Sequence, residues 1–219
     1  MYNGRSASGL REQASLRAAQ RERARVGSAR AKKMKAASPR VSFADLEQWP
    51  EDGCRYELYD GEVSVVPSPL PLHQVVSANL HLALTEYVRE HGGVVLYAPL
   101  DIVLTEYDVV QPDLLLFTRD RQGLINLRKV TRHQPDLAIE ILSASTASND
   151  RGRKLRLLAR HGVQEYWIVD PDAIRIEVYG LRGDRFQIAS TATGTEAVQS
   201  PLLPGLELRP IDVVPDPAA

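Results

Sequence analysis

The sequence predicts a mixed α/β (α+β) fold in which a β-sheet is flanked by helices. Short runs of branched and aromatic residues, which favour strands, are interspersed with longer segments whose apolar residues recur at helical spacing. Two of the runs, within 113–117 and 136–142, are apolar at almost every position, as in strands that are buried on both faces. The pattern therefore indicates a sheet packed between helices.

The predicted domain begins with a short helix and a hairpin. Ser42 is suited to cap the helix, and the hairpin over 55–66 turns at Asp60-Gly61. Three prolines then break the strand pattern. A long helix follows over 72–91, because apolar residues recur there every three or four positions and two glycines end the segment.

The rest of the domain alternates strands with one more helix. Strands are expected at 94–98, 101–104, 109–117, 136–142, 165–170, 174–179 and 186–190. A Ser/Thr-rich loop leads into a helix over 149–161, which Gly162 terminates. From Pro201 onward the chain is rich in proline and is expected to be irregular. We expect one globular domain over 41–212 and a flexible tail over 213–219.

Composition limits the class of protein. The chain has 219 residues, of which 43% are hydrophobic and 25% are charged, as is ordinary for a globular protein. The single cysteine, Cys54, excludes an internal disulfide and a cysteine-rich zinc site. No apolar run approaches the roughly 20 residues of a membrane span, and the N-terminus lacks the hydrophobic core of a secretory signal. We therefore expect a cytoplasmic protein.

The net charge of −1 conceals an uneven distribution along the chain. Residues 1–40 contain eleven Lys and Arg but only two Glu, a net charge of +9, so the remaining residues carry −10. This basic N-terminal arm has almost no large apolar side chains, and we expect it to be disordered or partly helical. Its basic residues could contact the phosphates of a nucleic acid. The alternatives are an inert tail and a start codon assigned too far upstream, with Met34 as the candidate start.

Three charged residues stand out because of where they fall in the predicted elements. Asp113 follows Pro112 at the start of one buried strand, and Glu140 lies inside another. Carboxylates are rare in such places unless they are paired or bind a metal ion. Lys154 lies in the first turns of the next helix, so its side chain can return to the same cleft. Two acids and a Lys that converge in this way are typical of a divalent-cation site that cleaves phosphodiesters.

Each of these residues also has a plainer interpretation. Asp113 could be held by a turn at the strand entry, Glu140 by a salt bridge at a sheet edge, and Lys154 could lie on a solvated helix face. Glu62, in the first hairpin, is either a third carboxylate of the site or an exposed acid. His73 and Gln74 open the long helix, whose N-terminus favours anions. They could contact a phosphate, and a capping or exposed His73 is the alternative.

A series of short motifs occurs in a fixed order along the chain. They are Tyr56–Glu62 (Tyr-Glu-Leu-x-Asp-Gly-Glu), Pro67–Pro69, His73-Gln74, Val110–Asp113, Pro135–Ser143, Asp150–Leu155 and Gly162–Pro171. In this order they resemble the Uma-type family of restriction endonucleases, over roughly residues 42–212. Because several separate motifs agree in order, the resemblance is specific.

The resemblance implies a fold and a set of site residues. The Uma-type family is similar to the PD-(D/E)xK nuclease superfamily, which implies a restriction-endonuclease-like mixed sheet of four or five strands flanked by helices. The family's Pro-Asp falls on Asp113 and its second acid on Glu140. In the superfamily a Lys usually stands two residues after that acid, but this position is Leu142 here. Uma-type members place the Lys on the next helix, which corresponds to Lys154.

We therefore predict a metal-dependent endonuclease that hydrolyses phosphodiester bonds of DNA. In this hypothesis Asp113, Glu140 and the backbone carbonyl of Ile141 bind Mg²⁺ or Mn²⁺, and Glu62 completes the site directly or through water. Lys154 orients the attacking water or stabilises the pentavalent phosphorane.

Two other function classes stay open at this point. The net charge of −10 outside the N-terminal arm is poor for gripping DNA, so the fold could instead be a catalytically inactive nuclease that serves as a binding or regulatory module. A hydrolase of small phosphate esters would lack salt-sensitive affinity for DNA. A homodimer would suit double-strand cleavage. There is no Gly-rich phosphate loop after a strand and no Gly-x-Ser-x-Gly elbow to support a different chemistry.

Overall fold

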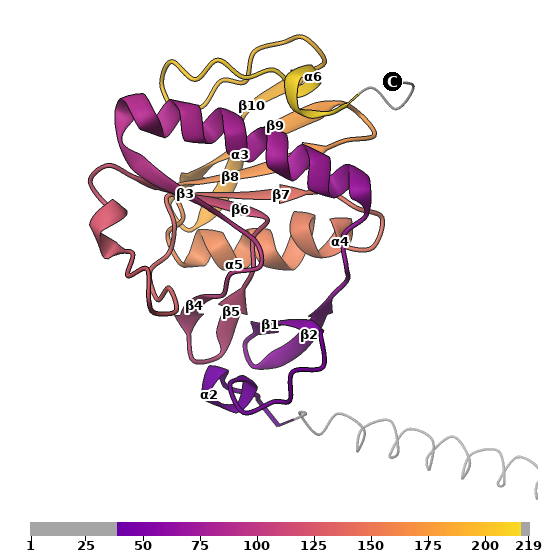
Figure 1. Ribbon diagram of the computed structural model, residues 1–219, viewed down its shortest axis with the longest axis vertical. Coiled ribbons are helices and arrows are strands. Elements are labelled where there is room, and N and C mark those ends of the chain that lie inside the picture. Colours follow the sequence, from indigo (N-terminus) through magenta and orange to yellow (C-terminus); the bar gives the residue numbers. More distant parts are fainter. Residues whose placement is uncertain (1–38, 216–219) are drawn as a thin grey trace, which may run out of the picture. The chain divides into compact units, whose positions relative to one another are not determined.

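The computed structural model describes residues 39–215, and the expectations for most of the basic N-terminal arm and for the last residues of the tail lie outside this range. Two β-sheets and a few helices confirm the mixed α/β class (Figure 1). The strands are β1 (Arg55–Tyr59), β2 (Glu62–Val66), β3 (Gly93–Tyr97), β4 (Ile102–Thr105), β5 (Asp108–Val110), β6 (Leu114–Thr118), β7 (Leu137–Ile141), β8 (Glu165–Asp170), β9 (Arg175–Arg182) and β10 (Arg185–Thr193). The helices are α2 (Phe43–Leu46), α3 (Pro71–His91), α4 (Ala147–Asn149), α5 (Leu155–Arg160) and α6 (Pro210–Val213), with a 3₁₀ turn η1 (Gln122–Leu124) and a π turn η2 (Asp150–Lys154).

The larger sheet has six strands in the order β10-β9-β8-β7-β6-β3, rather than the four or five that the family resemblance implies. Strands β7 and β8 run parallel, and the other pairs of this sheet are antiparallel. The parallel pair requires a crossover, which α4, η2 and α5 provide. The smaller sheet, β2-β1-β5-β4, is antiparallel throughout.

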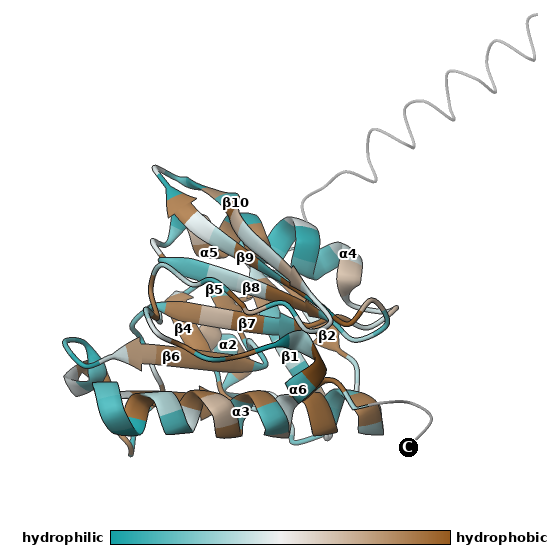
Figure 2. Cartoon of the chain, turned by 90° about the horizontal axis from the view of Figure 1, so that it is seen from above, coloured by the Kyte–Doolittle hydropathy of each residue, from teal (hydrophilic) through white to brown (hydrophobic). Residues whose placement is uncertain are grey.

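Both faces of the larger sheet are covered by helices, as the apolar strands predict. On one face, Val76, Leu80 and Leu84 of α3 pack against alternate residues of the central strands, such as Leu114 and Leu116. Hydrophobic and hydrophilic residues alternate along α3, as expected of a helix with one buried face (Figure 2). The other face carries Leu115, Phe117, Ala138, Tyr166 and Ile168, which pack against Leu157 and Leu158 of α5.

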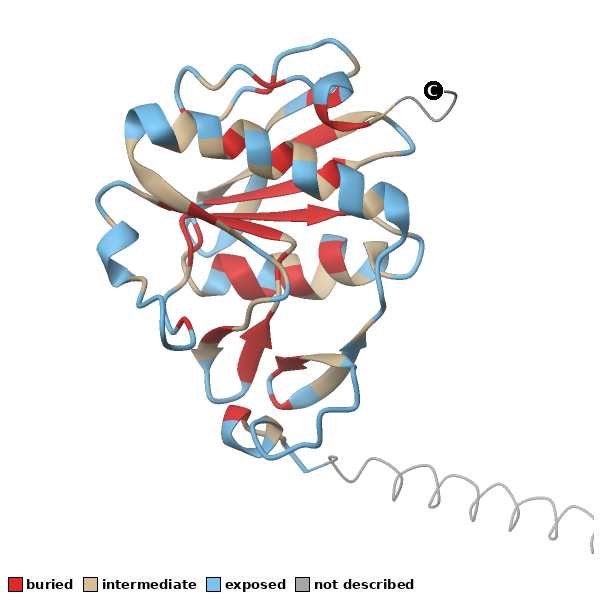
Figure 3. Ribbon diagram, in the orientation of Figure 1, coloured by how far each residue is buried: buried red, intermediate tan, exposed pale blue. Residues whose placement is uncertain are grey.

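The central strands are accordingly the most buried part of the described chain (Figure 3). Burial of one large apolar side chain contributes about 1.5–3 kcal/mol relative to leaving it in water. Every residue of β7 is buried, including Glu140. The burial of the apolar neighbours of Glu140 therefore holds this carboxylate in its place in the sheet.

The smaller sheet begins with the predicted hairpin. Asp60 and Gly61, at the turn, have φ angles of 54° and 78°, which both residues tolerate better than most and which suit a two-residue turn. A Cβ at Gly61 would lie 2.7 Å from the Cβ of Arg40, so the turn also needs glycine for space. The pairing of Glu57 with Ser64 and of Tyr59 with Glu62 fixes which side chains share a face of the hairpin.

The single strand expected over 109–117 is wrong, because the structure divides it into β5 and β6. Gln111, Pro112 and Asp113 lie between the two strands, and Pro112 has no N–H to give to a ladder. At this break the chain leaves the smaller sheet and enters the larger one. Asp113 therefore lies where the two sheets adjoin along the chain.

Two other elements differ in detail. The helix expected over 149–161 starts at Ala147 and passes through the π turn η2 before α5. π turns are rare in proteins, but those that do occur often lie at functional sites. The C-terminal segment, expected to be irregular, contains the short helix α6. Within residues 39–215, no helix combines the length and the apolar character that crossing a membrane requires.

Candidate active site

Asp113 and Glu140 lie on the same face of the larger sheet, on neighbouring strands. Strands β6 and β7 pair with Leu114 opposite Ile139, so the next position along the register sets Asp113 opposite Glu140. Both residues alternate with side chains that pack under α3, and they therefore point to the α5 side. Both side chains line one cleft of the described chain.

Lys154 reaches this pair of acids from the crossover helix. Its Nζ lies 2.9 Å from Oε1 of Glu140 and 2.9 Å from Oε1 of Glu57, and 3.8 Å from Oδ1 of Asp150. The Lys154 side chain is only 5% exposed, so it is not part of a solvated helix face. The π turn η2 carries both Asp150 and Lys154 and has its buried residues at these two positions.

Glu57 is a carboxylate of this cluster that the sequence analysis did not single out. It comes from β1 and is buried. Besides the ion pair with Lys154, its Oε1 accepts a hydrogen bond from the backbone N–H of Gln111 (2.8 Å), and its Oε2 accepts one from the hydroxyl of Tyr59 (2.8 Å). Glu57 therefore ties the smaller sheet to the segment that precedes Asp113.

His73 contacts Asp113 directly, as part of the first turn of α3. Its Nε2 lies 3.0 Å from Oδ2 of Asp113, and the same oxygen accepts a hydrogen bond from the backbone N–H of Ile141 (2.8 Å). These contacts occupy one carboxylate oxygen, and Oδ1 of Asp113 has no hydrogen-bond partner within the described chain. For Ile141 the structure gives this contact of the amide, and the role of its carbonyl stays a prediction. Gln74 is exposed and does not line the cleft.

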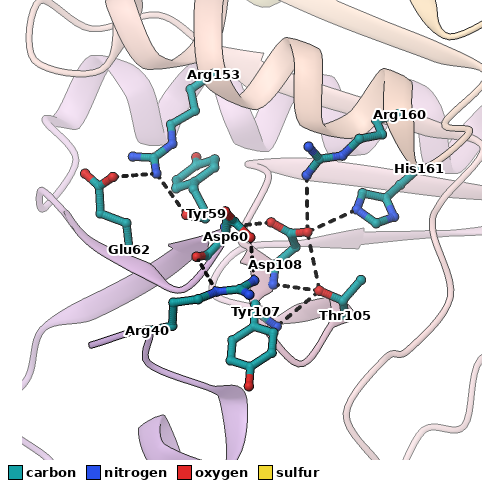
Figure 4. Close-up of polar contacts among 10 residues, drawn as sticks. All are labelled: Arg40, Tyr59, Asp60, Glu62, Thr105, Tyr107, Asp108, Arg153, Arg160 and His161. Carbon is teal, nitrogen blue, oxygen red and sulfur yellow. Dashed lines mark hydrogen bonds and ion pairs between the residues drawn. The ribbon is translucent and has the colours of Figure 1, made fainter. Parts of the chain in front are cut away.

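Glu62 is paired with Arg153 and not with Lys154 (Figure 4 shows the pair with Arg153). Its carboxylate accepts a hydrogen bond from Arg153 (3.0 Å), and its side chain is 73% exposed. Glu62 shares a face of the hairpin with Glu57 but pairs with Tyr59 next to the turn, whereas Glu57 lies two residues farther from the turn. The structure thus brings Glu57, and not Glu62, to the acids of the larger sheet.

The cluster lines a cleft of about 440 Å³. Its walls include Glu57, Gln111, Asp113, Glu140 and Lys154, together with His73, Asn149, Asp150 and the apolar segment 65–72. A larger hollow, of about 990 Å³, lies along residues 197–209. We assign the chemistry to the smaller cleft, because Arg209 and Asp212 of the larger hollow are paired with each other.

Burial and charge oppose each other in this cleft. Burial raises the pKa of Glu140 well above its ordinary value of 4.5, although the charge of Lys154 works in the other direction. Burial likewise raises the pKa of Asp150. For Lys154, burial alone would lower the pKa, but the carboxylates of Glu140 and Glu57 outweigh burial and raise it well above 10.5. The single positive charge of Lys154 cannot balance three buried carboxylates, those of Glu57, Glu140 and Asp150.

The donor atoms of the cleft fit a hard divalent cation. Oε1 of Gln111, Oδ2 of Asp150 and Oε1 of Glu140 are buried and accept no hydrogen bond within the described chain. Oε1 of Glu140 nevertheless lies 2.9 Å from Nζ of Lys154. The two groups form an ion pair even without an aligned hydrogen bond, because the attraction between charges does not depend on the direction of an N–H. Such oxygens are the ligands that Mg²⁺ and Mn²⁺ prefer. Among residues 39–215, however, no three His, Cys, Asp or Glu side chains already form a group that could hold a metal ion.

Sequence reasoning missed Glu57, Gln111 and Asp150. Two signals could have found the acids: Glu57 stands in the motif Tyr56–Glu62, and Asp150 stands four residues before Lys154 in the motif Asp150–Leu155. Gln111 likewise stands in the motif Val110–Asp113, two residues before Asp113.

Comparisons with known proteins agree with this fold. A crystal structure of a putative nuclease from Anabaena variabilis superposes with a TM-score of 0.67, over 80% of this chain and 97% of that one, at 19% sequence identity. At that identity the match establishes the fold alone, which is a mixed α/β fold.

The chain belongs to the Uma2 family, described as putative restriction endonucleases, because the model of that family matches residues 43–213. This match confirms the resemblance found in the sequence motifs. An uncharacterized protein of Synechocystis sp. is 26% identical over 149 residues, which are 67% of this chain and 77% of that protein.

Proposed function

We propose that this protein is a metal-dependent endonuclease that hydrolyses phosphodiester bonds of DNA. One observation carries the proposal: Asp113 and Glu140 stand opposite each other on one face of the sheet, and Lys154 enters the same cleft from the crossover helix. Membership of the Uma2 family supports the reaction class. The domain that would perform this reaction is proposed to span residues 41–212.

The acids have separate tasks in this proposal. Asp113 and Glu140 would hold Mg²⁺ or Mn²⁺, with the carbonyl of Ile141 as a further ligand. The bound ion would lower the pKa of a water and offset charge on the scissile phosphate. His73 and the N–H of Ile141 fix Oδ2 of Asp113, so Oδ1 would be the oxygen left for the ion. Glu62 is not included, because its carboxylate is paired with Arg153.

Lys154 supplies the positive charge on the phosphate side. An ammonium is a compact charge that suits a phosphate oxygen, and its burial means that little water screens the interaction. It would orient the attacking water or stabilise the charge that develops on the phosphorane. The Lys that the superfamily usually carries two residues after the second acid is replaced by Leu142 here, and Lys154 takes its place.

Cleavage of supercoiled plasmid DNA tests this function. The wild-type protein should nick the plasmid in Mn²⁺ or Mg²⁺ and not in EDTA. Asp113→Asn and Glu140→Gln should each abolish nicking, whereas Glu62→Gln should nick like the wild type. Circular dichroism and thermal melting check that the variants are folded. Nicking that persists in either Asp113→Asn or Glu140→Gln would contradict the proposal.

The net charge supports a second candidate. Residues 41–219 carry a net charge of −10, which opposes binding to a polyanion, so a catalytically inactive module of the same fold is the rival. Absence of nicking together with Mn²⁺ binding that does not depend on Glu140 would favour this module.

A further inference from the structure

We propose that Glu57 is a positioning residue for Lys154: it keeps the ammonium in place when Glu140 turns to a cation. The inference rests on the proposed function, in which Glu140 has two tasks that conflict. In the structure Glu140 is paired with Lys154, but as a metal ligand it must give part of its charge to the ion. Without another partner, the Lys154 ammonium would be buried beside a dication that repels it.

Glu57 has the geometry of such a partner. Its Oε1 lies 2.9 Å from Lys154 Nζ, the same distance as Oε1 of Glu140. Its own position is set by groups that the proposed ion does not need: the backbone N–H of Gln111 and the hydroxyl of Tyr59. The Tyr59 hydroxyl in turn accepts a hydrogen bond from Asn149 (2.7 Å), next to the π turn that carries Lys154.

The two acids also belong to different parts of the fold. Glu57 is on β1 of the smaller sheet, and Glu140 is on β7 of the larger one. A shift of Glu140 towards an ion therefore does not move Glu57. Lys154 itself belongs to neither sheet, so its contacts with both acids fix where the ammonium lies between the two sheets.

The first experiment compares two glutamates of one hairpin. In Glu57→Gln we expect kcat for plasmid nicking to fall about ten- to a hundredfold, the range typical of residues that orient an active-site group. KM for DNA and the affinity for Mn²⁺ should stay within about threefold of the wild type, and the matched control Glu62→Gln should be normal in all three. A full kcat in Glu57→Gln would overturn the inference. Loss of Mn²⁺ binding would also overturn it, because Glu57 would then be a ligand.

A double-mutant cycle separates positioning from general stability. If Glu57 acts through Lys154, adding Glu57→Gln to Lys154→Met should lower kcat no further. Independent, multiplicative losses would contradict the inference. Tyr59→Phe, which removes one hydrogen bond to Glu57, is the milder variant and should lower kcat in the same direction but less.

A third measurement needs neither metal nor activity, so it stands even if the proposed nuclease function fails. Mass spectrometry can follow how fast Lys154 reacts with an amine-acylating reagent. In Glu140→Gln, which takes away the partner on β7, Lys154 should stay slow to react because Glu57 still holds it. In Glu57→Gln/Glu140→Gln the reaction should be at least about tenfold faster, because both charged partners of the ammonium are gone. Equal rates in the single and double variants, both folded by circular dichroism, would refute the positioning role.

Discussion

At the scale of single residues, the site depends on a carboxylate in an unfavourable place. Glu140 is buried in the middle of a sheet, where an ionised acid requires strong compensation. Lys154 supplies part of it, and the pKa of Glu140 is nevertheless raised well above 4.5 because burial is the larger effect. A site of this kind loses stability so that charge can be concentrated where a ligand binds.

This raised pKa predicts how stability depends on pH in the metal-free protein. A folded-state pKa above the unfolded value means that the folded protein holds the proton more tightly. The stabilisation from Glu140 is therefore complete below about pH 4.5 and is lost as pH rises through the raised pKa. Above the raised pKa of Glu140, the free energy of unfolding of Glu140→Gln should exceed that of the wild type. This difference should disappear as the pH falls towards about 4.5.

Urea unfolding from pH 4.5 to 8.5 measures this difference. Glu62→Gln is the control, since it makes the same substitution at an exposed glutamate. Parallel curves for wild type and Glu140→Gln would show that Glu140 titrates as an ordinary surface acid.

A residue is conspicuous in the sequence where it departs from the pattern of its segment. Asp113 after proline and Glu140 inside an apolar run are both conspicuous, and the structure places them opposite each other. Their catalytic roles stay predictions. Glu57 was missed because it alternates with aromatic and apolar residues, as an ordinary strand acid does. Its partner Lys154 lies almost a hundred residues away in the sequence.

At the scale of elements, periodicity predicted which segments form strands and helices but not where a strand stops. The strand expected over 109–117 contains a proline, and its neighbours on both sides are apolar enough to belong to one strand. The break follows from tertiary structure, since β5 pairs with β1 and β4 whereas β6 pairs with β3 and β7. The turn at Asp60-Gly61 was predictable because its chemistry is local.

The junction between α3 and β3 gives an element-scale prediction. Gly93 has φ of 117°, and a Cβ there would lie 2.6 Å from the backbone oxygen of Phe117 in the neighbouring strand. Gly183, in the turn between β9 and β10, has φ of 65° and open space around it. Gly183→Ala costs about 1–2 kcal/mol for its left-handed backbone, whereas Gly93→Ala combines a positive φ outside the left-handed helical region with a clash.

We expect Gly93→Ala to lower the free energy of unfolding by at least about 1 kcal/mol more than Gly183→Ala does. Urea denaturation at neutral pH measures both values on the same scale. Equal losses would mean that the edge of the sheet moves freely enough to accept a methyl group at position 93.

At the scale of the whole molecule, the uneven charge is the dominant feature. Residues 1–38 contain ten Lys and Arg and two Glu, whereas residues 41–219 carry a net charge of −10. A nuclease whose catalytic part repels DNA needs a cationic surface elsewhere, and the N-terminal segment is the candidate by composition alone. The limits of the domain, the role of this segment and a homodimer all stay predictions.

Removal of residues 1–38 tests that role. If these residues bind phosphates, the shortened protein should bind DNA more weakly, and its affinity should depend less steeply on salt concentration. Fluorescence anisotropy with a labelled duplex between 50 and 300 mM salt gives both quantities. The same affinity and the same salt slope with and without the segment would identify it as an inert tail.

The proposed nuclease function depends on one ion shared by Asp113 and Glu140. Calorimetric titration of the full-length protein with Mn²⁺ tests this most directly, in parallel for the wild type, Asp113→Asn, Glu140→Gln and the control Glu62→Gln. We predict binding of Mn²⁺ to the wild type and to Glu62→Gln, and its loss in each of the other two variants. Unchanged Mn²⁺ binding in either Asp113→Asn or Glu140→Gln would contradict the claim that these two carboxylates hold one cation.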